Sequence, residues 1–390
     1  MAEYTISLVK TTEDKELFLS LPDKLYDKNY TMQDRGFEKE VLDGKHLIAK
    51  AAKIIALIVK DEPGEITGRV LLTMYEDDDI SYVGFFECIK ENKVADILLK
   101  ECEKISKACG KKKMLGPVNL SFWTGYRFAV KEELPYVGEP VNKSYYIPFW
   151  EEFGFYTCDE YISNIFETVD ESCKSVKAKK RFERAKEEGY TFSHPRMGNF
   201  EKHLKEIYPV LMEGYKGFTG FKKLSLKDFI EIYMPLKMIL DPDMVFLAYK
   251  QEKLKGFLIC IPDYGNLNSK RKTPDTVLKA MSIKSHAKRY VLLYMGADKD
   301  SLGIGSALSY LVMEMLKKRK AAAVSALIHV GKATGGYFKD KISEKKTTKR
   351  KMLEVFTNSE DEKHIEFIWY EVENSENDEV KIFARLNSGK

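Results

Sequence analysis

YVLLYMGADKDSLGIGSALSYLVMEMLKKRKAAAVSALIHVGKATGGYFKD, residues 290–340, is the stretch that decides the fold of this 390-residue chain. Its first part, Tyr290 to Met295, is an apolar run typical of a buried strand. Gly303 and Gly305 follow after a polar turn, and apolar residues then recur at three- and four-residue steps, as on one face of a helix. A second apolar run, Ala322 to Val330, predicts another strand. The stretch therefore predicts a strand, a glycine turn, a helix and a strand.

The two glycines lie at the N-terminus of the predicted helix. Backbone N–H groups without partners and the positive end of the helix dipole meet there, so an anion such as a pyrophosphate would be held. The alternative is that Gly303 and Gly305 only permit a tight turn, because glycines alone are a weak signal. The flanking strands and helix favour the binding function.

Residues Asp300-Ser-Leu-Gly-Ile-Gly305 resemble the central motif of the GNAT acyltransferase superfamily. That motif is a strand, a basic or amide residue, two variable residues, Gly, any residue, Gly or Ala, and a helix. Both glycines match, but Asp300 departs from the usual Arg or Gln and places an acid close to a pyrophosphate. The resemblance implies binding of acetyl-CoA or another acyl-CoA, with its pantetheine arm held at a bulge around 295–297. The residues implied in this binding are Met295, Ala297, Leu302, Gly303, Ile304, Gly305 and Ser306.

The composition excludes several classes of protein. The chain is 44% hydrophobic and 12% aromatic, which is typical of a globular protein, and its net charge of +4 predicts no particular partner. Six scattered cysteines without a CxxC pair suit a reducing cytosol. The N-terminus lacks the pattern of a signal peptide, and apolar runs such as Ile48 to Val59 are too short for a membrane span. We therefore expect a cytoplasmic protein.

A two-fold repeat runs through the chain. Two β-rich runs at 54–59 and 66–73 predict a hairpin, and 244–249 with 254–261 predict a second one in which Gly256 corresponds to Gly68. Strand, helix and strand then follow in each copy, over 80–119 and 290–330. In the first copy Asn92 is the expected N-cap, and residues 90–93 replace the glycine turn. We expect the first copy to be structural or to shape the substrate site, and the second to bind the cofactor.

The first copy also resembles a bacterial double-domain family of the GNAT superfamily, the YghO-like proteins. The matching pieces are Phe18 to Tyr26, Gly68-Arg69, Gly116 to Ser121, Tyr145-Tyr146 and Glu152 to Phe155. The resemblance implies an α/β architecture with a mixed sheet: two tandem GNAT-like folds, each splayed between its fourth and fifth strands.

The predicted organisation has three parts. Residues 1–168 form an N-terminal GNAT-like domain without cofactor, 169–189 a connecting helix, and 190–390 a C-terminal GNAT domain with the acyl-CoA motif. The basic residues of the connector indicate a solvated helix, and without interleaved aromatic residues we do not expect a nucleic-acid partner. Two runs at 365–372 and 380–386 predict a closing hairpin.

Acyl transfer to an amine requires a positioned thioester, an acceptor that loses a proton and a thiolate that gains one. The family resemblance assigns the role of general acid to Tyr337, four residues after Ala333, with a structural tyrosine as the alternative. His329, at the end of the predicted fifth strand, is a candidate base for the amine, although most strand histidines are structural. Asn119, Ser121 and Trp123 are candidates for orienting the substrate. No sequence motif for a metal site is present.

Three functions remain open. The first is an N-acyltransferase that moves an acyl group, such as acetyl, from acyl-CoA directly to a small-molecule amine. The second is aminoacyl transfer from charged tRNA, which would need no glycine turn and would use the basic connector. The third is a degenerate pair that binds a ligand without catalysis, which Asp300 favours. The sequence does not identify the acceptor or the oligomeric state.

Overall fold

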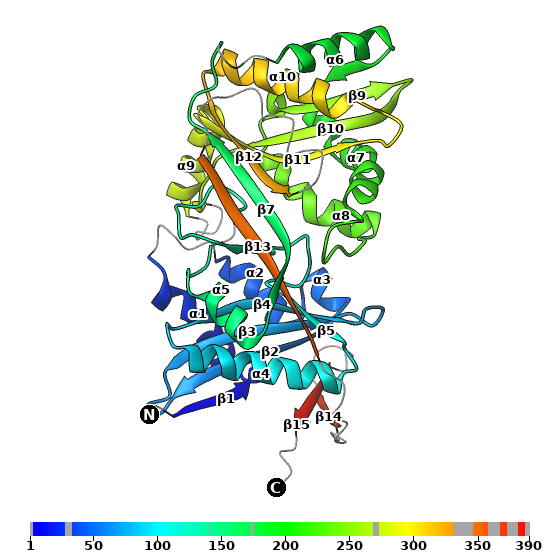
Figure 1. Cartoon of the computed structure of the whole chain (residues 1–390). Helices are drawn as coiled ribbons and strands as arrows, with labels where there is room; N and C mark the ends of the chain where they lie inside the picture. Colours follow the sequence, from blue (N-terminus) through cyan, green and yellow to red (C-terminus); the bar gives the residue numbers. More distant parts are fainter. Residues whose placement is uncertain are drawn as a thin grey trace.

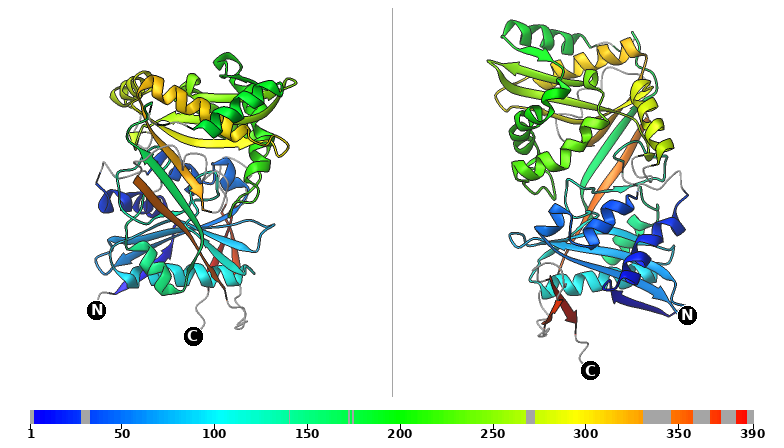
Figure 2. Two further views of the ribbon diagram at one scale, coloured as in Figure 1. Left: turned by 45° about the horizontal axis from the view of Figure 1, so that its top comes forward. Right: turned by 180° about the vertical axis from the view of Figure 1, so that it is seen from behind.

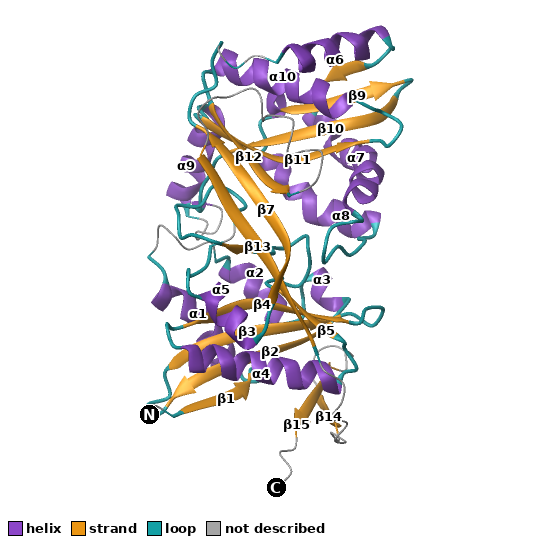
Figure 3. Cartoon of the chain, viewed as in Figure 1, coloured by secondary structure: helices purple, strands orange, loops and turns teal. Residues whose placement is uncertain are grey.

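The computed structural model describes residues 3–27, 33–139, 141–171, 173, 175–267, 273–330, 346–357, 367–372 and 381–386. Within these residues the chain has a mixed α/β architecture, in which helices cover a sheet that continues through both halves of the molecule (Figures 1 and 3). None of the described helices is long and apolar enough to cross a membrane.

The first half starts with an antiparallel meander of four strands, and its fifth strand joins the fourth in parallel. The strands are β1 (Tyr4–Leu8), β2 (Lys53–Asp61), β3 (Ile66–Met74), β4 (Ile80–Cys88) and β5 (Lys113–Gly116). The helices are α1 (Thr12–Leu25), α2 (Arg35–Leu42), α3 (Leu47–Lys50), α4 (Asn92–Ala108) and α5 (Tyr146–Phe153).

Successive side chains of a strand point to opposite faces of the sheet, and in β2 they enter two different cores. Leu57 and Val59 pack with α4 and α5, whereas Ile58 packs with α1, α2 and α3. The predicted N-cap at Asn92 is wrong by one residue: Glu91 occupies that position and makes no side-chain capping hydrogen bond. The short strand predicted to reach Asn119 ends at Gly116.

The second half repeats this plan. Its strands are β8 (Thr191–Ser193), β9 (Val245–Lys250), β10 (Lys253–Pro262), β11 (Arg289–Ala297) and β12 (Ala322–His329). Its helices are α6 (Val176–Glu187), α7 (Phe200–Tyr215), α8 (Leu226–Tyr233), α9 (Pro274–Ser285) and α10 (Ile304–Arg319), with short 3₁₀ turns η1 (Met197–Asn199), η2 (Met234–Met238) and η3 (Pro242–Met244). The predicted connecting helix is α6, which packs along α10 with Ala178 and Ala185 buried.

Two glycines confirm that the halves share one framework. A Cβ placed on Gly68 would lie 2.6 Å from a methyl carbon of Val94, at the start of α4. A Cβ placed on Gly256 would lie 2.7 Å from a methyl carbon of Ile304, at the start of α10. Each glycine therefore lets the helix that follows the fourth strand pack directly on the third strand.

The halves exchange their next strands. Strand β7 (Tyr156–Phe166) leaves the first half and pairs with β12, whereas β13 (Lys346–Phe356) leaves the second half and pairs with β5. The two exchanged strands pair with each other, so the sheet order is β1-β2-β3-β4-β5-β13-β7-β12-β11-β10-β9-β8. The short strand β6 (Phe128–Ala129) also pairs with β13. Figure 2 shows both long strands running between the halves.

Both halves splay between their fourth and fifth strands, as the resemblance implies. Strands β4 and β5 pair only from Ile80 to Tyr82, and β11 and β12 pair only from Arg289 to Leu292. The predicted closing hairpin is also present, as β14 (Phe367–Val372) and β15 (Lys381–Leu386) in a separate antiparallel pair.

Candidate functional site

A cavity of about 660 Å³ lies between the two halves, where both splays open. The first half contributes residues of β4 and of the segment 117–128, and the second half contributes the end of α7 and parts of β11 and β12. Among the predicted site residues, the cavity is lined by Asn119, Trp123, Met295 and His329. A volume of this size is typical of a small-molecule site.

The glycine turn has the local geometry that pyrophosphate binding requires. Gly303 is the N-cap of the 16-residue helix α10, and its φ of 91° is a left-handed conformation that glycine adopts without strain. Residues Leu302 to Ser306 lie together at this N-terminus, where Leu302 is exposed and Ile304 and Gly305 are buried. The first-turn amides of a helix lack intrahelical acceptors and favour an anion.

Charges on both sides of this turn affect how well it suits an anion. Asp300 is exposed, while Asp298 is paired with Lys255 at 2.6 Å. Arg181, on α6, approaches the turn so closely that a Cβ on Gly303 would lie 3.2 Å from its Cδ. Arg181 of the connecting helix therefore places a positive charge beside the turn, where the motif of this chain has the negatively charged Asp300.

The edge of β11 that separates from β12 leads from the cavity toward the glycine turn. The bulge of this strand lies at Leu293, where the register with β10 shifts, and not around 295–297 as predicted. Met295 lines the cavity, and Ala297 is the last residue of the strand. Burial raises the pKa of the Tyr215 phenol, and a hydrogen bond with the backbone of Met295 partly offsets this rise. A pantetheine arm that used this edge would therefore compete with the Tyr215 phenol.

The corresponding edge in the first half is already hydrogen-bonded within the chain. The Val118 amide donates to the carbonyl of Val83 at 2.8 Å, and the Phe85 amide donates to Oδ1 of Asn119 at 2.7 Å. A Cβ on Gly84 would lie 2.1 Å from the carbonyl oxygen of Val118, so the segment after β5 packs directly on β4. The first splay has no backbone edge free in this region for a pantetheine arm.

His329 is held by a carboxylate from the exchanged strand β7. Its Nε2 lies 2.8 Å from Oδ1 of Asp159, whose other oxygen accepts a hydrogen bond from Thr219. The ring packs edge-on against Tyr161 and Phe218. Among the described residues, Nδ1 of His329 has no hydrogen-bond partner. With the Nε2 proton donated to Asp159, Nδ1 keeps its lone pair and can accept a proton.

The three candidates for orienting a substrate have structural partners. Besides Asn119, which closes the first splay, Ser121 is buried and its hydroxyl accepts the Trp123 amide at 3.2 Å. Trp123 lines the cavity, and its indole N–H donates to the carbonyl of Lys222 at 2.6 Å. Ser121 is not among the residues that line the cavity. Tyr337 lies outside the described residues.

The sequence analysis did not single out the polar groups that the first half brings to the cavity. Arg69 and Glu38 form a buried ion pair at 2.7 Å, and Glu87 accepts the phenols of Tyr26 and Tyr146 at 2.8 and 2.7 Å. Removal from water raises the pKa of Glu87 to about 7, although Arg69 opposes the rise. Arg127 is a further buried cation on this wall. Arg69, Tyr26 and Tyr146 lie in pieces that resemble the YghO-like family, but that resemblance assigns no role to them.

In the part of the chain that the structure describes, no group of three or more His, Cys, Asp or Glu residues could hold a metal ion. The described cysteines are all free.

No family model and no curated protein matches this sequence. Solved structures do resemble it. One is the GCN5-related glucosamine N-acetyltransferase region of a fungal multi-domain GH3 β-N-acetylglucosaminidase, with a TM-score of 0.55 and 12% identity over 91% of this chain. The match covers 38% of the fungal chain.

Two further structures are similar over most of their own length. A tandem GNAT protein from the clavulanic acid biosynthesis pathway has a TM-score of 0.53 and 8% identity, over 93% of this chain and all of the other. A conserved Enterococcus faecalis protein, described as a probable N-acyltransferase, has a TM-score of 0.52 and 10% identity, over 92% and 74%. At these identities the likeness establishes the fold: the chain is built of two tandem GNAT-like folds. The narrower resemblance to YghO-like proteins remains a prediction.

Proposed function

We propose that this protein is an acyl-CoA-dependent N-acyltransferase that moves an acyl group from acetyl-CoA or another acyl-CoA to a small-molecule amine. One observation carries the proposal. In the second half, the separated edge of β11 lines the central cavity, and the chain continues from this strand to the glycine turn at Gly303 that starts α10. The first half has neither feature, because its helix starts without glycine and its edge is closed by Val118 and Asn119.

The chain's own residues suit such a co-substrate in three places. The amides of Leu302 to Ser306 would bind the pyrophosphate at the start of α10, and Arg181 would add positive charge beside them. The backbone of Met295 and Ala297 would hold the pantetheine arm once the Tyr215 phenol releases Met295. The thioester would then lie in the cavity, where aromatic side chains exclude water.

Proton transfer is the chemistry that remains for the side chains. His329, oriented by Asp159, would accept a proton from the acceptor's ammonium group, so that the free amine attacks the thioester carbonyl. Tyr337 would give a proton to the departing thiolate. Because transfer is direct, we expect a ternary complex and no acyl-enzyme burst.

The proposed place of action is the cytoplasm, as a protein that needs no metal, membrane or nucleic acid. Six cysteines without a CxxC pair, of which Cys88, Cys102, Cys173 and Cys260 are buried, support a reducing compartment. Because α6 carries exposed basic residues, tRNA is the alternative substrate that the experiment must include.

Calorimetry with acetyl-CoA, octanoyl-CoA and total tRNA tests the proposal directly. We expect one binding site for an acyl-CoA and none for tRNA. A screen of amines and amino acids with a thiol-release readout then identifies the acceptor. Binding of tRNA without acyl-CoA would favour aminoacyl transfer. Binding of acyl-CoA with no thiol release for any amine would favour a non-catalytic pair, and binding of neither would refute both transferase proposals.

A further inference from the structure

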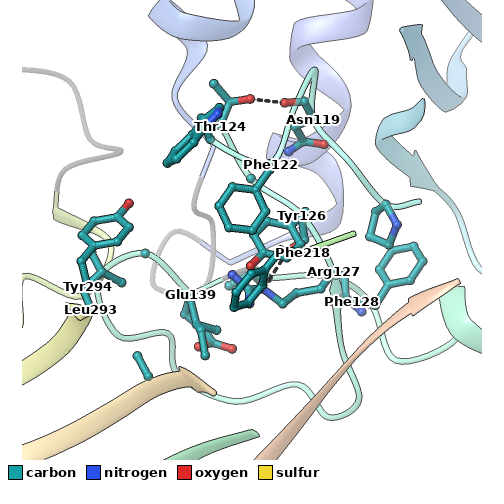
Figure 4. Close-up of a pocket in the computed structure, with 18 of the residues that line it drawn as sticks. Asn119, Phe122, Thr124, Tyr126, Arg127, Phe128, Glu139, Phe218, Leu293 and Tyr294 are labelled. Carbon is teal, nitrogen blue, oxygen red and sulfur yellow. Dashed lines mark hydrogen bonds between the residues drawn. The ribbon is translucent and has the colours of Figure 1, made fainter. Parts of the chain in front are cut away.

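Arg127 is a buried cation on the wall of the central cavity. It lies between the Val118–Tyr126 bridge and β6, in a loop whose backbone is tightly constrained. Its side chain is only 6% exposed, and its φ of 76° is unusual for a residue with a side chain. Such conformations cost free energy and are concentrated at functional sites. Figure 4 shows Arg127 among the aromatic rings around the cavity.

The contacts of Arg127 leave hydrogen-bond donors unused. Its guanidinium carbon lies 3.7 Å from the ring centre of Tyr126 and 4.6 Å from that of Tyr161. Nε donates to the carbonyl of Tyr126 at 3.1 Å. Among the described residues, Nη1 is buried without a hydrogen-bond partner, and no carboxylate lies within 4.0 Å of the guanidinium.

The neighbouring charges do not neutralise this cation. Glu139 also lines the cavity, but its carboxylate is bonded by the buried Arg350. Arg127 attracts this carboxylate only at longer range, because the Glu139 carboxylate is bonded to Arg350 and not to Arg127. The carboxylate of Asp159 is engaged by His329 and Thr219. Arginine keeps its proton, and a buried charge without a paired counter-ion is strongly destabilising, so an anion from outside the chain would stabilise this guanidinium.

We propose that Arg127 binds the carboxylate of the acyl acceptor, so that the acceptor is an amino acid and not a simple amine. This proposal rests on the function proposed above, because it assumes that His329 accepts the proton from the ammonium group of the same amino acid. A carboxylate carries one negative charge for the one positive charge of Arg127, whereas a phosphate dianion would bring two negative charges into a cavity that Glu38, Glu87 and Glu139 already line. The guanidinium lies over the Tyr126 ring with Nη1 unpartnered, and a planar guanidinium can bind a carboxylate through two N–H bonds.

The remaining walls indicate what kind of amino acid fits. Phe122 stacks on Tyr126 with ring centres 4.6 Å apart, and Phe218 and Tyr215 form a second stacked pair at 5.0 Å. Leu293 and Tyr294 of β11 line the same cavity. Aromatic walls of this kind favour a large apolar or aromatic side chain.

Three probes separate the contributions of the two polar ends. L-Phenylalanine carries both an amine and a carboxylate, 3-phenylpropionate lacks the amine, and 2-phenylethylamine lacks the carboxylate. Calorimetry on the full chain should show that the two carboxylate probes bind at least about 10-fold more tightly than 2-phenylethylamine, since a charged two-bond pair contributes at this level. The experiment needs no acyl-CoA, so its result does not depend on catalysis.

Variants of Arg127 and one matched control complete the test. Arg127→Gln should weaken binding of both carboxylate probes about 10- to 100-fold and leave that of 2-phenylethylamine unchanged. Arg127→Lys keeps the charge and should retain part of the preference. The control Arg184→Gln removes an arginine that is exposed on α6 and pairs with Glu188, and should change nothing. Melting temperatures establish that each variant is folded.

Each outcome decides the proposal. Equal affinity for L-phenylalanine and 2-phenylethylamine, no binding of either carboxylate probe, or unchanged carboxylate binding in Arg127→Gln would overturn it. Thiol release with amines that lack a carboxylate, at equal rates, would overturn it and leave the acyltransferase function standing. Carboxylate binding that depends on Arg127 but produces no thiol release with any amino acid would support the carboxylate site and refute the transferase.

Discussion

The two halves of the molecule share a framework but differ at the pair of residues that faces each other across the third and fourth strands. In the first half this pair is Arg69 opposite Glu87, and in the second it is Phe257 opposite Gly296. The glycines that precede Arg69 and Phe257 occupy equivalent places, so the comparison is made at matched positions. One half therefore builds a polar, charged cluster where the other builds an apolar contact.

The equivalent helices α4 and α10 also differ in the residue at which they start. Helix α10 starts at a left-handed glycine, whereas α4 starts after Glu91 in an extended conformation. The first half also closes the edge of β4 with its own segment 118–119. A duplicated fold thus keeps the residues that pack helix on sheet, while the residues around the splay diverge. This divergence is what the proposed function requires, since it assigns cofactor binding to the second half and substrate shaping to the first.

Gly303→Val is the substitution with the largest expected effect. A β-branched residue is strongly disfavoured at a φ of 91°, and its Cβ would press against Arg181. We expect calorimetry to show loss of acyl-CoA binding in this variant. The matched substitution Glu91→Val, at the start of α4, should leave binding unchanged. Two equivalent sites in the unmodified protein would break the comparison between the halves.

Tyr337→Phe tests the proposed general acid, and Tyr146 of the first half provides the matched comparison. Loss of a general acid should lower kcat by roughly 100- to 10,000-fold with little change in acyl-CoA affinity. Its counterpart, Tyr146, is fully buried and donates to Glu87, so Tyr146→Phe should lower the melting temperature and leave turnover of the folded protein intact. An unchanged kcat in Tyr337→Phe would remove this residue from the mechanism.

Glu87→Gln tests the polar cluster of the first half through its pH dependence. The pKa of Glu87 is raised to about 7, so the folded state holds a proton that the unfolded state releases above about pH 4.5. The stability that this proton contributes is complete below pH 4.5 and is lost as the pH rises through 7. Relative to Glu87→Gln, the free energy of unfolding of the unmodified protein should fall by at most about 3 kcal/mol between pH 5 and pH 8.

Denaturant titrations of both proteins at several pH values measure this difference. A stability gap that does not change with pH would show that Glu87 is ionised throughout the range. The matched pair in the second half, Phe257 opposite Gly296, has no ionisable side chain and therefore should show no such pH dependence.

Asp300→Arg has the smallest expected effect. It replaces an exposed acid beside the glycine turn by arginine, one of the two residues, Arg or Gln, that the resemblance to the GNAT motif leads us to expect there. Solvent screening limits the gain in acyl-CoA affinity to about 1 kcal/mol. Calorimetry at low salt checks the change, and Arg181→Gln should move the affinity in the opposite direction. Unchanged affinity in both variants would show that neither side chain faces the bound anion.

Periodicity and turn residues predicted most of the local structure. The alternating apolar runs gave the two hairpins, the three- and four-residue spacing gave α4 and α10, and the glycine turn lies where the motif predicts it. The elements that were predicted differ from the structure at their ends, such as the N-cap at Glu91 and the bulge at Leu293, whereas the long strands β7 and β13 and the helices α7, α8 and α9 were not predicted. Element ends depend on single hydrogen bonds, which a periodic pattern does not specify.

The sequence by itself determined the two-fold repeat, the hairpins and the strand–helix–strand unit common to both halves, and the glycine turn, because each is a property of neighbouring residues. Only the tertiary structure decided that the halves exchange β7 and β13, which brings Asp159 to His329 from 170 residues away. It also decided that Arg127 is buried beside a cavity shared by both halves. Burial, ion pairing and pKa depend on groups brought together from distant segments, and no local pattern of residues records them.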